Sequence, residues 1–508
     1  MGETDVARVL SYHARSKHAL DRYAAGPGTL DWDAQPEAFR DWAGTQQTAL
    51  PREVRVADIS WGALAVSRPP APLDAAHLGS LLRLCVGLTA WKEYGASRWS
   101  LRAHPSSGNL HPTETWLIAA GAGDIADGLY HYQNRNHALE RRAWGGEADA
   151  QGVWLGFSSI HWREAWKYGE RAFRYCQLDM GHVLAAVSYA AALHGWKPCL
   201  LNLEPSALAH GLGLDREADF DGVEGEEAEV VVALTSDDPL PMSWQHWEGL
   251  PSLLDPRPLY RWPVIDEVAT ATRGRGPDAL VAAAVAPRAA DEIGAARVIL
   301  KRRSAQAFDG ESVMPQALFG RMLASLMPGG SPVWELWPHA ARVHPVLLVH
   351  RVEGMAPGLY ALPRSEAARG ALQAAFREAF SWQPADSGLP LFQLVAARAG
   401  KTARTLSCHQ DIASQCAVTF MMVAEFAAPV AADPAAYRHL HWEAGMLGHV
   451  ITLEAEAAGW RGTGIGCFFD DADHEVLGLK DGQFQVIYHY AVGMALDDPR
   501  ISMLPAYE

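Results

Sequence analysis

The chain contains the same long helical pattern twice. Residues 173–197 (FRYCQLDMGHVLAAVSYAAALHGWK) align without a gap with residues 437–461 (YRHLHWEAGMLGHVITLEAEAAGWR). In each copy, apolar residues recur every three or four positions, which is typical of a buried helix. Gly195 and Gly459 lie where a glycine often ends a helix. A repeat of this kind predicts a fold built from two similar units.

The repeat extends well beyond the helix. Both copies close on a β-rich run, at 229–240 and 485–500, and both carry a Gly-Leu-Tyr motif upstream, at 127–132 and 357–362. With 508 residues, the chain is too long for one ordinary core. Helices and strands are mixed within each copy, and a long buried helix beside short strands predicts two fused domains of the α+β class. We expect an N-terminal extension at 1–60, a first domain at 61–240, a linker rich in Pro and Gly at 241–290, and a second domain at 291–508.

One loop differs sharply between the two copies. Both copies have a proline, five further residues and then His-Pro before an apolar strand. The first copy offers Ser106, Ser107, Gly108 and Asn109 where the second has 339–342, with the sequence HAAR. Short polar side chains suit the edge or the hydroxyl chain of a bound molecule, and glycine permits a left-handed turn. The same composition is also that of an ordinary turn.

Four segments resemble the FMN-dependent nitroreductase superfamily. They are LKRRSAQAFDG (300–310), HPSSGNLHPTETW (104–116), WKYGERAFRYCQLDMGH (166–182) and EAAGWRGTGIGCFFDD (456–471). The third is more specifically similar to the SagB/ThcOx/McbC branch, which oxidises azolines to azoles in peptide natural products. The resemblance implies a homodimeric fold with two FMN sites, each built by both subunits, so that a duplicated chain can fold as its own dimer.

The two copies have lost complementary parts of such a site. The second copy has Arg302, Arg303 and Ser304 where the first has a lone Arg68 among prolines. The second copy also has the glycine-rich segment 462–466 where the first has the bulkier PCLLN, at 198–202. The second copy ends DDPR, with Arg500, and the first ends DDPL. Conversely, only the first copy keeps the Pro-Ser-Ser-Gly-Asn loop. We therefore predict one FMN site per chain, at the interface between the domains.

The resemblance implies a defined set of cofactor ligands. An arginine fork suits the FMN phosphate because it donates two hydrogen bonds and stays charged. The glycines of 462–466 would let backbone amides face the flavin edge that becomes anionic on reduction; they do not open a helix, as a dinucleotide-binding motif would. The candidate cofactor-binding residues are Pro105, Ser106, Ser107, Asn109, Arg302, Arg303, Ser304, Gly464, Ile465, Gly466 and Arg500.

Lys167 and Tyr168 match the Lys-Tyr pair of the azoline-oxidising branch and are the candidate catalytic residues. Desaturation requires a base, and a desolvated lysine can act as one because burial disfavours its charged form. Alternatively, the lysine only extends along an aromatic segment. Asp179 and His182, at i and i+3 on the repeated helix, either reach the site or belong to an internal polar network.

The composition excludes several other classes. The net charge is −16 with no basic cluster, which argues against a nucleic-acid partner, and no apolar run approaches the 18 residues of a membrane span. The N-terminus lacks the apolar region of a secretion signal. Six scattered cysteines without a C-x-x-C motif fit a reducing cytoplasm; Cys408 and Cys416 are expected to be buried, and no metal is expected. Arg174 and Arg438 occupy the same repeat position and are expected to be structural.

Three functions remain open at this point. The first is an FMN-dependent dehydrogenase or oxidase that carries out a two-electron oxidation of an azoline-like or amino-acid-derived unit, small or bound to a peptide or carrier, with O2 as the electron acceptor. The second is an NAD(P)H-dependent nitro- or ene-reductase of the same superfamily. The third is a binding module on a fold that has lost its activity. A monomeric pseudo-dimer is expected, with higher oligomers left open.

Overall fold

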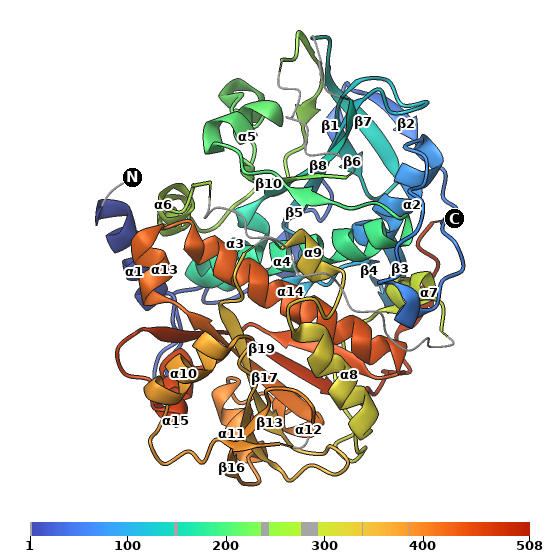
Figure 1. Ribbon diagram of the computed structural model, residues 1–508. Helices are drawn as coiled ribbons and strands as arrows, with labels where there is room; N and C mark the ends of the chain where they lie inside the picture. Colours follow the sequence, from blue (N-terminus) through green and yellow to red (C-terminus); the bar gives the residue numbers. More distant parts are fainter. Residues whose placement is uncertain are drawn as a thin grey trace.

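The computed structural model describes residues 3–146, 151–234, 243–275, 293–337, 339–385 and 387–507. Each half of the chain forms an antiparallel β-sheet, and two long helices lie between the sheets (Figure 1). The chain is thus arranged as two similar domains that face each other. This arrangement confirms the predicted α+β fold of two fused domains.

The two sheets have the same strand order. It is β7-β6-β5-β8-β10-β9 in the first half and β16-β14-β13-β17-β19-β18 in the second, with antiparallel neighbours throughout. The strands of the first sheet are β5 (Thr113–Ala120), β6 (Gly128–Gln133), β7 (Ala138–Trp144), β8 (Gly152–Ser159), β9 (Cys199–Leu200) and β10 (Glu227–Ala233), with β2 (Gln46–Ala49) and β11 (His246–Trp247) beside β7. Those of the second sheet are β13 (Val343–Val349), β14 (Gly358–Ala361), β16 (Phe392–Ala396), β17 (Val418–Glu425), β18 (Arg461–Ile465) and β19 (Phe484–Gly493), with β15 (Gln383–Pro384) beside β16.

The repeated helices are α4 (Ala172–Leu193) and α14 (Ala436–Ala457), which cross at a pair of equivalent glycines. A Cβ atom at Gly181 would lie 2.1 Å from the Trp442 carbonyl oxygen, and one at Gly445 would lie 2.1 Å from the Leu178 carbonyl oxygen. Only glycine therefore allows this approach. Both helices are buried almost all round because each lies between a sheet and the other helix.

The core is continuous across the two halves. Leu117 on β5 and Leu347 on β13 point inward to one apolar cluster that includes α4 and α14. Their neighbours Ile118 and Val346 point outward to separate clusters on the far face of each sheet, as the alternation of side chains along a strand requires. Among the other helices of the described residues, α2 (Ala75–Cys85) packs on α4 and α8 (Gln316–Leu326) packs on α14. The structure also contains α3 (His161–Tyr168), α5 (Pro205–Gly211), α7 (Ala295–Lys301), α9 (Val333–Leu336), α10 (Glu366–Ala375), α11 (Gly400–Leu406), α12 (Ile412–Gln415), α13 (Ala427–Ala432) and α15 (Asp470–Leu477).

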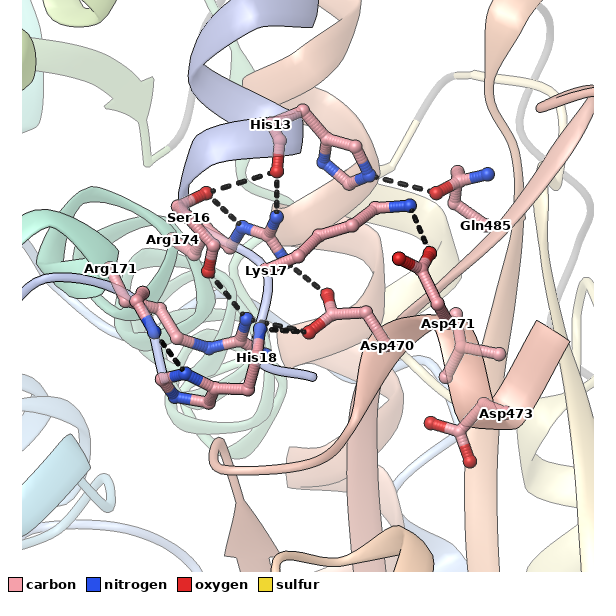
Figure 2. A network of polar contacts seen from close by, with 12 residues as sticks. His13, Ser16, Lys17, His18, Arg171, Arg174, Asp470, Asp471, Asp473 and Gln485 are labelled. Atoms are coloured by element: carbon pink, nitrogen blue, oxygen red, sulfur yellow. Dashed lines mark hydrogen bonds and ion pairs between the residues drawn. The ribbon is translucent and has the colours of Figure 1, made fainter. Parts of the chain in front are cut away.

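The N-terminal extension joins the two halves. It begins with α1 (Glu3–Arg15) and is held by a polar network around Asp470 (Figure 2). The Asp470 carboxylate accepts hydrogen bonds from Arg171 Nη1 (2.8 Å), Arg174 Nη1 (2.6 Å) and the His18 backbone N–H (3.0 Å). Arg174 also donates to the Ser16 hydroxyl at 2.9 Å. The arginines belong to the first half and Asp470 to the second, so this network fixes their relative position.

The C-terminal tail and part of the predicted linker return to the first half. β20 (Ser502–Leu504) pairs with β3 (Leu88–Tyr94), which forms a hairpin with β4 (Ser97–Arg102). Within the predicted linker 241–290, the described residues 243–275 contain β11, β12 (Leu250–Pro251) and α6 (Pro263–Ala271), and β12 pairs with β1 (Trp42–Ala43). Residues 241–242 and 276–290 of that linker lie outside the described residues.

Candidate active site

A cavity of about 520 Å³ lies between the two halves of the molecule. Its wall includes the Pro-Ser-Ser-Gly-Asn loop of the first half, the Arg-Arg-Ser segment before the second sheet, and the end of β18. Of the predicted site residues, the cavity brings together Pro105, Ser106, Ser107, Asn109, Tyr168, Arg302, Arg303, Ser304, Gly464, Ile465 and Gly466. Asp179 and His182 of α4 also line it.

Asp179 anchors the loop from beneath. The Ser106 hydroxyl donates to Asp179 Oδ2 at 2.7 Å, and the Ser107 hydroxyl and backbone N–H donate to the same carboxylate at 2.8 and 3.0 Å. Burial raises the pKa of Asp179 to about 7, against the opposing effect of these hydrogen bonds. The two serine protons are thus directed at Asp179, and the serines can offer a bound molecule only their oxygen lone pairs. Asn109 Nδ2 is bound to the Ser100 carbonyl at 2.9 Å.

Two buried arginines form a cationic end of the cavity. Arg302 Nε and Nη2 donate to the carbonyl oxygens of Ala103 (2.8 Å) and Arg102 (3.1 Å), and Arg303 Nη1 donates to the Thr89 hydroxyl (3.1 Å). These partners belong to the first half, so the segment crosses the interface.

Within the described residues, neither arginine has a carboxylate at ion-pair distance. Burial lowers the pKa of Arg302 to about 10 and lowers those of Arg303 and Lys92, which also lines this end. Glu456 lies nearby, but burial raises its pKa, with the arginines opposing. Buried positive charge that makes no ion pair within the described residues is suited to a bound anion such as a phosphate.

The glycines at the end of β18 make room for tyrosines. Within this segment, Arg461–Ile465 form an edge strand beside β19. A Cβ atom at Gly464 would lie 1.9 Å from Tyr488 Oη, and one at Gly466 would lie 2.3 Å from the Tyr175 ring. Arg171 Nη2 holds the Gly466 carbonyl at 3.1 Å, which connects this wall to the Asp470 network.

Lys167 and Tyr168 lie at the C-terminal end of α3, against the loop. A Cβ atom at Gly108 would lie 2.5 Å from Tyr168 Oη and 3.1 Å from Lys167 Nζ. Lys167 is beside the cavity wall, with Nζ 5.2 Å from the centre of the Trp32 ring. Burial lowers its pKa, and the nearby Glu164 carboxylate acts in the opposite direction.

Arg500 does not reach the cavity. Its side chain is exposed and donates to Asp498, with Nη2–Oδ2 at 2.6 Å, and its guanidinium lies over the Tyr94 ring. The prediction of a phosphate-binding Arg500 is therefore not supported by its placement. The physical reason is local: an aspartate two residues away captures the guanidinium in solvent. Its counterpart Leu240 lies outside the described residues.

The pseudo-symmetric position also lies between the two halves, and it holds a cavity of only about 70 Å³. Leu200 and Leu201 stand there where the second half has Gly464 and Ile465. His339 and His439, at the repeat positions of Ser106 and Tyr175, stack with ring centres 5.7 Å apart. Larger side chains thus fill the second position.

Several lining residues carried no recognisable signal in the sequence. Cys408 was expected to be buried, but it is half-buried and lines the cavity beside Cys467, whereas Cys416 is buried as predicted. Lys92 comes from the β3–β4 hairpin, and Tyr23 from the N-terminal extension. Only Cys467, next to the glycine-rich segment, could have been suspected from its position.

A family model described as the Nitroreductase family matches residues 299–494. Among solved structures, the whole chain is similar to a putative nitroreductase from Anabaena variabilis ATCC 29413, with a TM-score of 0.70 at 22% identity over 96% of this chain and 99% of that one. A putative nitroreductase from Ralstonia eutropha JMP134 matches at a TM-score of 0.28 and 17% identity, over 42% of this chain and 97% of that one. A chain of the E. coli microcin synthetase McbBCD complex with truncated pro-MccB17 bound matches at a TM-score of 0.27 and 18% identity, over 47% and 95% respectively.

No curated protein matches the chain significantly. The match to the Nitroreductase family model is limited to residues 299–494, in the second half, and the full chain has the fold of two fused nitroreductase-like domains. Among the described residues, no helix is both long and apolar enough to cross a membrane, and no group of three or more metal-binding side chains occurs.

Proposed function

We propose that this protein is an FMN-dependent oxidoreductase with one flavin site per chain, at the interface of its two domains. The observation that carries the proposal is the asymmetry between the two pseudo-symmetric positions. One is a cavity of about 520 Å³ with buried, unpaired cations at one end, and the other is a cavity of about 70 Å³ filled by leucine and histidine side chains. Ligand pockets commonly measure about 300–1,000 Å³.

The residues of the large cavity fit FMN. Arg302 and Arg303, with Lys92 beside them, supply the positive charge that a phosphate dianion requires. Hydroxyl and backbone groups of Ser304 and of the Ser106–Asn109 loop offer hydrogen-bonding atoms for the ribityl chain and the ring edge. Tyr175 and Tyr488 add aromatic surface to the wall. Arg500 is left out of this ligand set.

FMN, when bound, supplies a two-electron acceptor for hydride. In the proposed reaction Lys167, in its neutral form, removes a proton from the substrate carbon next to the bond being oxidised. Burial favours that neutral form. Tyr168, whose side chain lines the cavity, orients the substrate or passes on the proton. Gly108 lets both side chains approach the loop.

The substrate we propose is an azoline-like or amino-acid-derived unit, carried by a small molecule, a peptide or a carrier, as in the SagB/ThcOx branch, with O2 as the final acceptor. We place the protein in the cytoplasm, in keeping with six cysteines that are scattered along the sequence without a C-x-x-C motif. The alternative is an NAD(P)H-dependent nitro- or ene-reductase, which the match of residues 299–494 to the Nitroreductase family favours.

The two functions differ in what reduces the flavin. With the FMN-loaded protein held without oxygen, we expect a thiazoline- or oxazoline-containing peptide to bleach the flavin absorbance, and we expect NADPH to do so slowly or not at all. Fast bleaching by NADPH with no response to azolines would establish the reductase instead. A protein that binds no FMN would contradict both.

A further inference from the structure

Two cysteines with no role in the proposed reaction lie together in the wall of the cavity. Cys408 follows α11, Cys467 follows β18, and both are half-buried. Their segments are joined by the hydrogen bonds Phe469 N–H to Leu406 carbonyl (2.8 Å) and Gln410 Nε2 to Cys467 carbonyl (3.2 Å). Both side chains line the same cavity, and each thiol shifts the pKa of the other.

The surroundings of the two thiols shift their pKa values in opposite directions. The neighbour with the largest effect on the pKa of Cys467 is the Cys408 thiol, and His18 and Arg171 have smaller effects in the same direction. His18 Nδ1 accepts the Ala24 N–H at 2.8 Å, so the ring proton lies on Nε2 and that nitrogen is the one able to donate to sulfur. These contacts lower the pKa of Cys467 to about 5, against the effect of burial. The Cys467 contact and burial raise the pKa of Cys408.

The other ionisable groups around the two cysteines add no unpaired negative charge that would disfavour a thiolate at Cys467. Burial raises the pKa of each neighbouring tyrosine, so these side chains are neutral at pH 7, and Asp470 is held by Arg171 and Arg174. The tyrosines are Tyr23, Tyr168 and Tyr175. The opposite directions of the two pKa shifts favour a thiolate at Cys467 and a protonated thiol at Cys408, which is the pattern of an attacking and a resolving cysteine.

The backbone at Cys408 is also unusual. Cys408 and His409 have φ angles of 52° and 59°, in the region that residues other than glycine rarely adopt. Such conformations persist where the surrounding structure imposes them and are concentrated at functional sites. Here the strained turn carries the Cys408 thiol next to Cys467.

We propose that Cys467 and Cys408 form a redox-active dithiol that reacts with small disulfides entering the cavity. The Cys467 thiolate attacks one sulfur of the disulfide, the disulfide bond breaks, and one thiolate leaves with the proton of Cys408. The Cys408 thiolate then attacks Cys467 sulfur and releases the second thiolate. The small disulfide gains two electrons and becomes two thiols, while the pair loses two and becomes an intramolecular disulfide. His18, which belongs to the N-terminal extension, favours the Cys467 thiolate that carries out the first step.

The experiment treats the purified full chain, with whatever cofactor it carries, with 2,2′-dipyridyl disulfide. Release of pyridine thione and the mass of the peptides that contain residues 408 and 467 are followed together. We expect two equivalents of thione from the pair and a Cys408–Cys467 cross-link without a retained pyridyl group. The rate should change less than about twofold between pH 6.5 and 8, because an ordinary thiol with a pKa of about 8.5 would accelerate about tenfold per pH unit.

Variants separate the two roles. C408S should release one equivalent and keep the pyridyl group on residue 467, and C467S should lose the fast phase. C199S, which changes a half-buried cysteine elsewhere, should behave like the wild type. A wild type that keeps a stable pyridyl adduct on Cys467, or a rate that rises with pH like that of an ordinary thiol, would overturn the proposal. Because flavin is not measured, the outcome is independent of the proposed function.

Discussion

At the scale of single residues, Gly108 shows how one missing side chain arranges the candidate catalytic pair. Its φ of 58° lies in the left-handed region, and Tyr168 Oη and Lys167 Nζ occupy the space that a Cβ atom would need. Both obstructing atoms are the ends of flexible side chains, so an added methyl group would displace them without breaking the fold. Gly95 has the same φ of 58° with nothing within 4 Å, and it is a matched control.

Gly108→Ala and Gly95→Ala should each lower the free energy of unfolding by about 1 kcal/mol, because both place a side chain in the left-handed region. Only Gly108→Ala should also lower turnover, by about 100-fold, since misplacing a catalytic group by about 1 Å can have that effect. Thermal unfolding and steady-state rates check the two parts. Equal losses of turnover in both variants would show that the contacts of Gly108 are unimportant.

Lys167→Ala should retain flavin and lose about 10²–10⁴-fold in turnover, the range typical of a general base. Lys167→Arg should be as inactive, because arginine stays protonated. Since burial lowers the pKa of Lys167, the wild-type rate should rise with pH and level off below the ordinary lysine value of about 10.4. Lys480→Ala, at an exposed position, is the control. Unchanged turnover in Lys167→Ala would remove this residue from the mechanism.

Motifs that are present in one copy and missing from the other contain residues that the structure places together. The loop 105–109 and Arg302–Ser304 reach one cavity. Arg500 lies outside that cavity, because Asp498, two residues away, binds its guanidinium. The hydrogen bonds from Ser106 and Ser107 to Asp179 were not predictable, because they depend on the spacing between a loop and a helix about 70 residues apart in the chain.

At the scale of elements, the N-terminal extension, the start of α4 and α15 are joined by buried charged side chains near the site. Burial raises the pKa of Asp470, but the Arg171 and Arg174 guanidiniums outweigh it and hold that pKa far below its usual range. Asp471, one residue further on, makes an exposed pair with Lys17 at 2.7 Å. Asp470 makes buried ion pairs and Asp471 makes an exposed one on the same helix, so the two positions can be compared directly (Figure 2).

Asp470→Asn should lower the free energy of unfolding by about 3–5 kcal/mol, because it leaves buried arginines without a counter-charge. Asp471→Asn should cost less than about 1 kcal/mol. The folded-state pKa of Asp470 is depressed, so its contribution is present above the unfolded value of about 3.9 and is lost as the pH falls through the folded value. Denaturant unfolding at pH 7 and pH 3 should therefore show the variant's deficit shrinking in acid. Equal deficits for the two variants at pH 7 would contradict this account.

Long helices and strands were predictable from periodicity, and both repeated helices end next to the predicted glycines. The path of the extension was not predictable. The contacts that place it, such as His18 with Asp470, join residues 452 positions apart, and no local pattern encodes such a distance.

At the scale of the whole molecule, the chain folds as a pseudo-dimer whose two halves are no longer equivalent. The matching strand orders and the glycine crossing of α4 and α14 preserve the symmetry of the core. The interface cavities have diverged, since only one keeps both the loop and the arginines. The duplication predicted this architecture, whereas the volumes of the two cavities depend on packing that the sequence comparison could only suggest.

The most direct test of this account is the amount of FMN bound per chain at saturation, measured by absorbance of the flavin released from a known amount of protein. The account predicts about one FMN per chain, and a loss of that FMN in Arg302→Ala but not in Arg68→Ala, the position of the lone arginine in the other half. Two FMN per chain, or retention of the flavin in Arg302→Ala with loss in Arg68→Ala, would contradict it.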